Sequence, residues 1–297
     1  MGNFDEINSI LVPVDYSETS RLACQYALHV AHRTNASLTI FHAFHSPAYD
    51  LIELTGNKSE QIKLWDEVTS KLSQVEEKSL ESFLTGISGS KNPNGSGPIV
   101  ISRIIRPGLA KDEIQKYARE YRPDLVIMGA KGKDKKGNSI IGSTAEIAIK
   151  KVKFPVLTVP QDYLLTDIQE KRKLLFLTEY DESDFMSVIE LIRFARQLNL
   201  SIYCLHVGSR SGKWEKIKMK GLQVYFNTTY EDIPVDCDVL SHEGNPFKAI
   251  DNFIKSNAIG LLSLTSRKRN LLEKFIKPNQ ECQVSYQTST PMLVFHF

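Results

Sequence analysis

The sequence lacks most of the features that would place a protein in a membrane or in a disulfide-bonded scaffold. It has only four cysteines in 297 residues and no C-x-x-C pair, which argues against a zinc knuckle and a disulfide framework. No apolar run reaches the roughly 18–20 residues that span a bilayer, and the N-terminal segment MGNFDEINS does not resemble a secretory leader. We therefore expect a cytoplasmic protein with reduced, buried cysteines, no metal site and no membrane partner.

A surplus of one charge sign is also missing. The chain has 37 lysines and arginines against 35 acidic residues, a net charge of +2, which is far below the surplus typical of proteins that bind nucleic acid. The hydrophobic fraction of 41%, the charged fraction of 24% and the mean hydropathy of -0.24 are those of a folded globular chain. At about 150 residues per domain, the length favours two domains.

Short apolar runs alternate with helical patterns along the chain. The apolar runs lie at 10–14, 38–43, 99–105, 125–128 and 156–159, and the helical patterns begin near residues 17, 109 and 143. Strands that alternate with helices form a mainly parallel sheet. The predicted fold class is therefore α/β.

The chain also resembles itself. An ungapped shift of 136 residues aligns FPVLTVP with TPMLVFHF, and a shift of 164 places His42 on His206. The offsets differ because the first copy has an extra helical segment near 57–84 and a linker, GISGSKNPNGSG, rich in Gly, Ser and Asn. We interpret the chain as a tandem duplication, with domains at 1–162 and 173–297 joined by a linker at 163–172.

One segment, GAKGKDKKGNSIIGST, directly follows the strand pattern DLVIM and precedes a helix. Glycines let backbone amides approach an anion, and a helix N-terminus directs unpaired N–H groups at the same place. The segment therefore predicts phosphate binding. Its lysines add positive potential or simply solvate the loop; they are Lys131, Lys133, Lys135 and Lys136.

Two other motifs are near misses. The stretch GKDKKGNS approaches a P-loop, but Asn138 stands where the phosphate-binding lysine is required. His29 with His32, and His42 with His45, have the H-x-x-H spacing, yet no acidic or cysteine partner completes a metal site in the sequence. We interpret these histidines as packed or surface residues.

The spacing G-x2-G-x9-G-S, with the opening LVPVDYS and the closing PVLTVP, closely resembles the ATP-binding branch of the universal stress protein family. The resemblance covers nearly the whole chain as two copies. It implies two doubly wound five-stranded parallel sheets with strand order 3-2-1-4-5, an adenine-nucleotide alpha-hydrolase-like fold. It also implies ATP, with or without magnesium, at the carboxyl ends of strands 1 and 4, where such sheets open a crevice.

The resemblance assigns binding roles residue by residue and implies no catalytic residue. Asp15 matches the acidic residue near the ribose and adenine, Pro13 and Val14 line the base pocket, and the backbone of Ala43 meets the adenine edge. The residues that match the stretch around ribose and phosphates are Met128, Gly129, Gly132, Gly142, Ser143 and Thr144, with Lys131 in the same loop.

Two of these roles have local alternatives. Asp15 could form an Asx turn or cap the following helix, and Ser17 is a second candidate cap. Ser143, three residues before Glu146, could form a capping box and bond its own helix. In that case its backbone N–H would still be available to a phosphate.

The second copy departs from the motif. Under the 136-residue shift the motif positions fall on Thr265, Lys268, Pro278 and Asn279, and Asp15 falls on Thr178 or Glu179. Proline also removes an amide donor. We therefore expect one nucleotide per chain, in the first domain. The final strands of the two copies, PVLTVP and PMLVFHF, are expected to pair within one chain as a pseudo-dimer, with a homodimer as an open alternative.

The main functional hypothesis is a nucleotide-responsive stress or signalling protein that does not turn ATP over quickly and acts on an unknown protein partner. The alternatives are a slow ATPase or nucleotidyl-transfer enzyme, and an interaction module that needs no nucleotide.

Overall fold

The computed structural model describes residues 6–46, 58–87, 98–130, 141–179, 182–208, 212–265 and 289–295. The strands are β1 (Ser9–Val14), β2 (Ser37–Phe44), β3 (Ile101–Pro107), β4 (Leu125–Gly129), β5 (Val156–Val159), β6 (Lys173–Thr178), β7 (Ser201–Gly208), β8 (Val235–Ser241), β9 (Leu261–Thr265) and β10 (Met292–Phe295). The helices are α1 (Glu18–Thr34), α3 (Lys58–Thr85), α4 (Ala110–Tyr121), α5 (Ser143–Lys151), α6 (Asp167–Glu170), α7 (Glu182–Leu198), α8 (Lys213–Thr229) and α9 (Pro246–Ser256).

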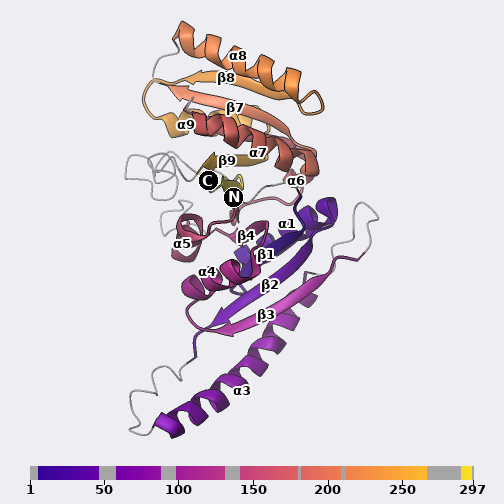
Figure 1. Ribbon diagram of the computed structural model, residues 1–297, viewed down its shortest axis with the longest axis vertical. Helices are drawn as coiled ribbons and strands as arrows, with labels where there is room; N and C mark the ends of the chain where they lie inside the picture. Colours follow the sequence, from indigo (N-terminus) through magenta and orange to yellow (C-terminus); the bar gives the residue numbers. More distant parts are fainter. Residues whose placement is uncertain are drawn as a thin grey trace.

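The ten strands form one sheet in the order β3-β2-β1-β4-β5-β10-β9-β6-β7-β8 (Figure 1). Read from either edge inward, each half has the strand order 3-2-1-4-5, as the family resemblance implies. The prediction of two sheets differs from the structure, because the inner edge strands β5 and β10 pair with each other. The two predicted sheets are therefore one continuous sheet.

The pairing of β5 with β10 is antiparallel, with Met292 opposite Thr158 and Val294 opposite Val156. On its other side β10 pairs with β9 in parallel. All four residues of β10 are buried, and Leu293 and Val294 have no exposed surface. The expected pairing of the two final strands is confirmed.

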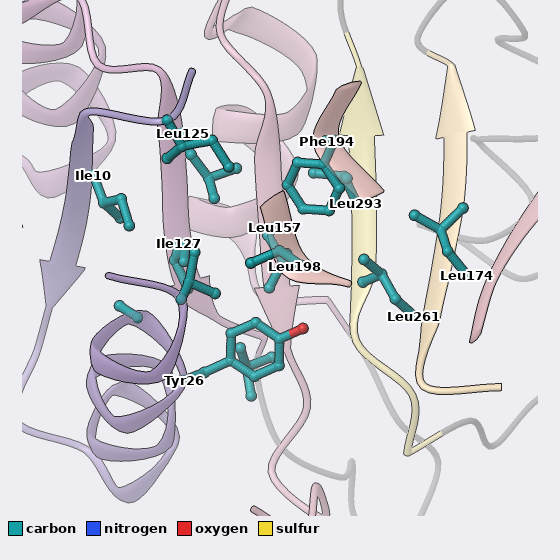
Figure 2. Close-up of a cluster of buried hydrophobic side chains, with 14 of the residues drawn as sticks. Ile10, Tyr26, Leu125, Ile127, Leu157, Leu174, Phe194, Leu198, Leu261 and Leu293 are labelled. Atoms are coloured by element: carbon teal, nitrogen blue, oxygen red, sulfur yellow. The ribbon is translucent and has the colours of Figure 1, made fainter. Parts of the chain in front are cut away.

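Helices cover both faces of the sheet and form two hydrophobic clusters. Alternate residues of one strand enter different clusters: Ile10 and Val12 face α1, whereas Leu11 faces the side of α4 and α5. The cluster on the α1 and α7 side runs across the junction of the two halves (Figure 2). Its members include Ile10, Tyr26, Leu157, Phe194, Leu261 and Leu293. A shared core therefore joins the two halves as well as the shared sheet.

The element bounds repeat at the two predicted offsets. A shift of 164 residues carries β1, α1 and β2 onto β6, α7 and β7, and a shift of 136 carries β4 and β5 onto β9 and β10. His42 Nδ1 lies 2.8 Å from the Val14 carbonyl oxygen, and His206 Nδ1 lies 2.9 Å from that of Thr178. The matching contacts align Asp15 with Glu179 without a gap.

The segment 163–172, predicted as a linker, contains α6 and the buried Tyr163. Tyr26 and Tyr163 lie with ring centroids 5.6 Å apart, so this segment packs against α1. Most of the second predicted linker, 88–97, lies outside the described residues.

Two expectations drawn from absences can be examined in the described part of the chain. No helix there is both long and apolar enough to cross a membrane. Cys24 and Cys204 are buried free thiols, as expected, whereas Cys237 is only half-buried. Cys282 lies outside the described residues.

Candidate functional site

The carboxyl ends of β1 and β4 lie side by side in the first half of the sheet. Ile10 pairs with Leu125 and Leu11 with Val126, so the same register carried to the strand ends places Val14 beside Gly129. β1 and β4 are parallel neighbours, but the chain continues from them in opposite directions across the sheet. β2 and β3 are added on the far side of β1, and β5 is added on the far side of β4. Doubly wound sheets bind ligands at such switch points. We call this region the switch edge.

Most of the predicted site residues lie along the switch edge. Pro13 and Val14 end β1, Ala43 is the penultimate residue of β2, and Met128 and Gly129 end β4. The side chains of Val14 and Met128 are buried, and Ala43 is half-buried. Lys131 and Gly132 lie outside the described residues.

Gly142, Ser143 and Thr144 form the N-terminus of α5. Gly142 is the N-cap residue, with φ -65° and ψ 156°, and no side-chain cap hydrogen bond is made within the described residues. The expected capping box is therefore wrong: Ser143 is the first helical residue, and the Glu146 carboxylate lies 3.0 Å from Lys150 Nζ instead. Because the N-cap is a glycine, its side chain supplies no acceptor to the first-turn N–H groups of α5, and the positive end of the helix dipole favours an anion there.

Gly129 has a packing role that the motif alone does not reveal. A Cβ atom at this position would lie 2.8 Å from Thr19 Cγ2 and 2.9 Å from the Thr19 carbonyl oxygen. Any larger residue would push α1 away from the end of β4. The glycine is thus required by close helix–strand contact, whatever binds nearby.

Asp15 is exposed and forms a local turn. Its Oδ1 accepts hydrogen bonds from the Ser17 backbone N–H, at 3.1 Å, and from the Ser17 hydroxyl. Ser17 in turn caps α1 by accepting from the Ser20 N–H. Partial burial opposes ionisation of Asp15, but these hydrogen bonds from Ser17 outweigh it and hold the pKa of the carboxyl below its ordinary value. The Asx-turn alternative is confirmed, and a ribose contact by this ionised group remains a prediction.

Sequence reasoning missed a side-chain cluster beside Asp15. Tyr16 has a left-handed backbone (φ 62°), and its ring stacks on that of His42 with centroids 4.3 Å apart. Its hydroxyl donates to Glu76 Oε2 at 3.1 Å, and His42 Nε2 lies 3.5 Å from the same oxygen. Burial and then the bond to Glu76 raise the pKa of Tyr16. The cluster fixes the end of β1 against α3.

One other cavity in the described residues is too small for a nucleotide. This cavity lies between α1 and α7, at the amino ends of the strands. Its volume is about 20 Å³, which is room for a single water rather than a nucleotide. The described part of the chain contains no group of three or more His, Cys, Asp or Glu side chains placed to hold a metal ion.

Comparisons with known proteins point to one family. The model of the universal stress protein family matches residues 6–160. Universal stress protein MJ0577 of Methanocaldococcus jannaschii is 26% identical over 157 residues, which cover 50% of this chain and 93% of the relative. Universal stress protein MJ0531 of the same organism is 25% identical over 150 residues, covering 50% and 80%.

Solved structures extend the likeness to both halves. A universal stress protein from Archaeoglobus fulgidus covers 99% of this chain and 97% of its own, with a TM-score of 0.67 at 17% identity. A functionally unknown protein from Pseudomonas aeruginosa, PA1789, covers 98% and 93% with a TM-score of 0.61 at 13% identity. These two structures show a shared fold across all ten strands, and the family model matches more than half of the chain. The chain belongs to the universal stress protein family.

Proposed function

We propose that this protein binds one adenine nucleotide per chain, ATP with or without magnesium, at the switch edge of its first half, and responds to it without turning it over quickly. The observation that carries the proposal is the N-terminus of α5, the helix that follows β4, where the glycine N-cap supplies no side-chain acceptor to the first-turn amides. A nucleotide supplies phosphates for these amides.

The remaining residues suit the other parts of a nucleotide. Val14 and Met128 are buried apolar side chains at the strand ends, and Val14 is in register with His42, directly before Ala43. They offer an apolar floor with a backbone edge for a base. Asp15, ionised by its turn, supplies a carboxylate acceptor for ribose hydroxyls.

The second half supports a single site. Thr265 takes the position of Gly129, and Glu179 that of Asp15. Thr178, in the position of Val14, donates its hydroxyl to Asp184 Oδ2 at 2.8 Å, so this strand end bonds to its own helix. In this proposal the domains 1–162 and 173–297 arose by duplication and act in the cytoplasm as a built-in pair, joined through β5 and β10, that presents a surface to a protein partner.

The test compares two substitutions of Gly142. In Gly142→Asp the new carboxylate caps the first turn of α5 and repels a phosphate, so affinity for ATP should fall at least tenfold while the free energy of unfolding is kept. Gly142→Ala adds a Cβ without charge or cap and should retain most of the affinity. The measurement is calorimetric titration with ATP, AMP and cyclic AMP, with and without magnesium; a universal stress protein has been solved with cyclic AMP.

Several results would overturn the proposal. Equal ATP affinity in Gly142→Asp and wild type would remove α5 from the site. A stoichiometry of two nucleotides per chain would contradict the single site, and many turnovers per minute to ADP would favour the enzyme. Absence of both heat and thermal shift at millimolar ATP would favour the interaction module.

A further inference from the structure

Helix α8 of the second half has apolar side chains on two opposite sides. Met219 and Phe226 are buried against the sheet. On the other side Trp214 is 75% exposed, Ile217 58%, Val224 56% and Tyr225 44%. At 100° per residue these four lie within a sector of about 100°, which is one side of the helix. We call them the α8 stripe.

Lysines border the α8 stripe. Lys213, Lys216, Lys218 and Lys220 are all exposed, whereas the helix has one acidic residue, Glu215, which is half-buried. Lys220 Nζ bonds the neutral amide of Gln223 at 3.2 Å rather than a carboxylate. The exposed side of α8 therefore combines apolar area with net positive charge.

The α8 stripe lies where a large surface can reach it. α8 is at one end of the long axis of the molecule, beside the edge strand β8 (Figure 1). Gly221 lies within the same sector of the helix, and a Cβ added there would meet nothing within 4 Å. This side is convex and open, so it suits a flat surface better than it suits a small ligand.

The corresponding helix of the first half, α3, has no such stripe among its described side chains, 62–63 and 65–85. Like α8, it connects the second and third strands of its half along the chain. It lies at the opposite end of the molecule from α8 (Figure 1). Its exposed apolar residues Ile62 (62%) and Val75 (57%) are about 140° apart around the helix, because thirteen residues separate them. Six acidic residues outnumber four lysines along it. The α8 stripe is thus a property of this helix and not of the fold.

We propose that the α8 stripe docks on an anionic phospholipid surface, which the protein contacts without crossing. A second copy of α8 would bring like charges together, and the described side chains of α3 in another copy offer no matching stripe. Lysines beside exposed Trp, Ile, Val and Tyr are the composition of helices that lie in the headgroup region, where each lysine gains from anionic lipids. The expectation of no membrane partner rested on the lack of a spanning segment, which surface docking does not need.

The experiment is co-sedimentation of the full chain with vesicles, without nucleotide, so it is independent of the proposed function. Binding is expected to vesicles of equal parts phosphatidylglycerol and phosphatidylcholine, not to phosphatidylcholine alone, and to be released by high salt. The double variant Ile217→Ser, Val224→Ser should lose at least tenfold in affinity, as should Lys216→Gln with Lys220→Gln. The matched control, Ile62→Ser with Val75→Ser, removes equally exposed side chains from α3 and should bind as wild type.

Three outcomes would overturn the proposal. The first is no sedimentation with anionic vesicles. The second is an equal loss from the α8 and α3 double variants, which would assign binding to general hydrophobicity. The third is a dimer in sedimentation-velocity runs without lipid that Ile217→Ser, Val224→Ser dissociates, which would assign the α8 stripe to a second copy.

Discussion

The two halves of the sheet share one backbone plan but have different residues where β1 and β4, or β6 and β9, end. In the first half these positions are small or apolar, and in the second half they are polar and buried. The corresponding pairs are Val14 and Thr178, Ile127 and Ser263, and Gly129 and Thr265. The same strand order therefore allows either apolar residues or buried polar residues at the carboxyl ends of these strands.

Hydrogen bonds explain how the second half tolerates this polarity at Thr178, whereas the buried hydroxyls of Ser263 and Thr265 have no hydrogen-bond partner among the described residues. Asp184 Oδ2 accepts from the Thr178 hydroxyl at 2.8 Å and from the Glu179 N–H at 2.7 Å, which offsets the desolvation of these groups. In the first half Ser20 takes the place of Asp184 and donates to its own helix, to the Ser17 carbonyl. The second half thus uses its switch point to tie β6 to α7. The difference teaches that the polarity of the strand ends can change while the fold is kept.

The largest expected effect comes from removing the strand that joins the halves. Deletion of 291–297 removes β10, which lies between β5 and β9 with all four residues buried. Both neighbouring strands would become apolar edges, so the truncated chain should aggregate or unfold without cooperativity.

A single substitution that tests the same strand is Leu293→Asp, because Leu293 is 0% exposed. Its control is Leu164→Asp, since Leu164 is 64% exposed. Size-exclusion chromatography and urea unfolding measure the result. Limited proteolysis should release the first half more intact than the second, since the first half keeps its own five strands. A soluble, cooperatively melting truncation would contradict this account.

The next largest effect is expected when the residues of one corresponding pair, Gly129 and Thr265, are exchanged between the halves. Gly129→Thr introduces the residue of the second half, and its Cβ would lie 2.8–2.9 Å from Thr19 atoms. We expect a loss of about 3 kcal/mol in the free energy of unfolding. Thr265→Gly should cost less, about 1 kcal/mol.

A control for Gly129→Thr is Gly221→Ala, because the added methyl meets nothing within 4 Å and alanine favours the helix by about 1 kcal/mol. Urea unfolding should therefore show a loss at Gly129 and a gain at Gly221. A neutral Gly129→Thr would mean that α1 can move away from β4 without cost.

A smaller difference is expected from the polar network of the second half. Asp184→Ala leaves the Thr178 hydroxyl and the Glu179 N–H without this acceptor and should cost about 2 kcal/mol, against about 1 kcal/mol for Ser20→Ala in the first half. Adding Thr178→Val to Asp184→Ala removes one of the stranded donors and should recover part of the loss. Strictly additive losses in this double-mutant cycle would show that the two residues are not coupled.

Much of the fold follows from periodicity and self-similarity in the sequence. The apolar runs mark the strands of the first half, and the offsets of 136 and 164 residues recur in the element bounds. The strand order came from the family resemblance, and the motif spacing led to the switch edge. These features are local patterns or repeats, which a single sequence displays directly.

The remaining features depend on contacts that a sequence does not display. Tyr16 reaches Glu76 across sixty residues, and its left-handed backbone is not a preference of tyrosine. The packing requirement at Gly129 arises from Thr19, in another element. The N-cap residue is Gly142 rather than Ser143, a one-residue difference that decides whether the N-cap side chain supplies an acceptor to the first-turn amides.

The smallest predicted effect concerns the contact between α1 and α7. His29 Nε2 accepts a hydrogen bond from Arg33 Nε at 3.0 Å, and Arg33 Nη1 donates to the Leu198 carbonyl at 2.9 Å. Burial, followed by the positive charges of Arg33, His32 and Arg172, lowers the pKa of His29 to about 4. The position corresponding to His29 in α7 is Arg193, which pairs with Glu190. A titrating group at this position therefore belongs to the first half alone.

A histidine whose pKa is lower in the folded chain takes up its proton first in the unfolded chain. Stability should therefore fall as the pH drops from about 6.5 toward about 4, and level off below that. His29→Gln keeps an acceptor for Arg33 and cannot titrate, so its free energy of unfolding should change less between pH about 7 and about 5. The pH-dependent change in the free energy of unfolding should be smaller in His29→Gln than in wild type by about 1 kcal/mol, since the partly exposed ring is screened by solvent. Equal pH slopes for wild type and His29→Gln, measured by urea unfolding, would show that the acid sensitivity arises elsewhere.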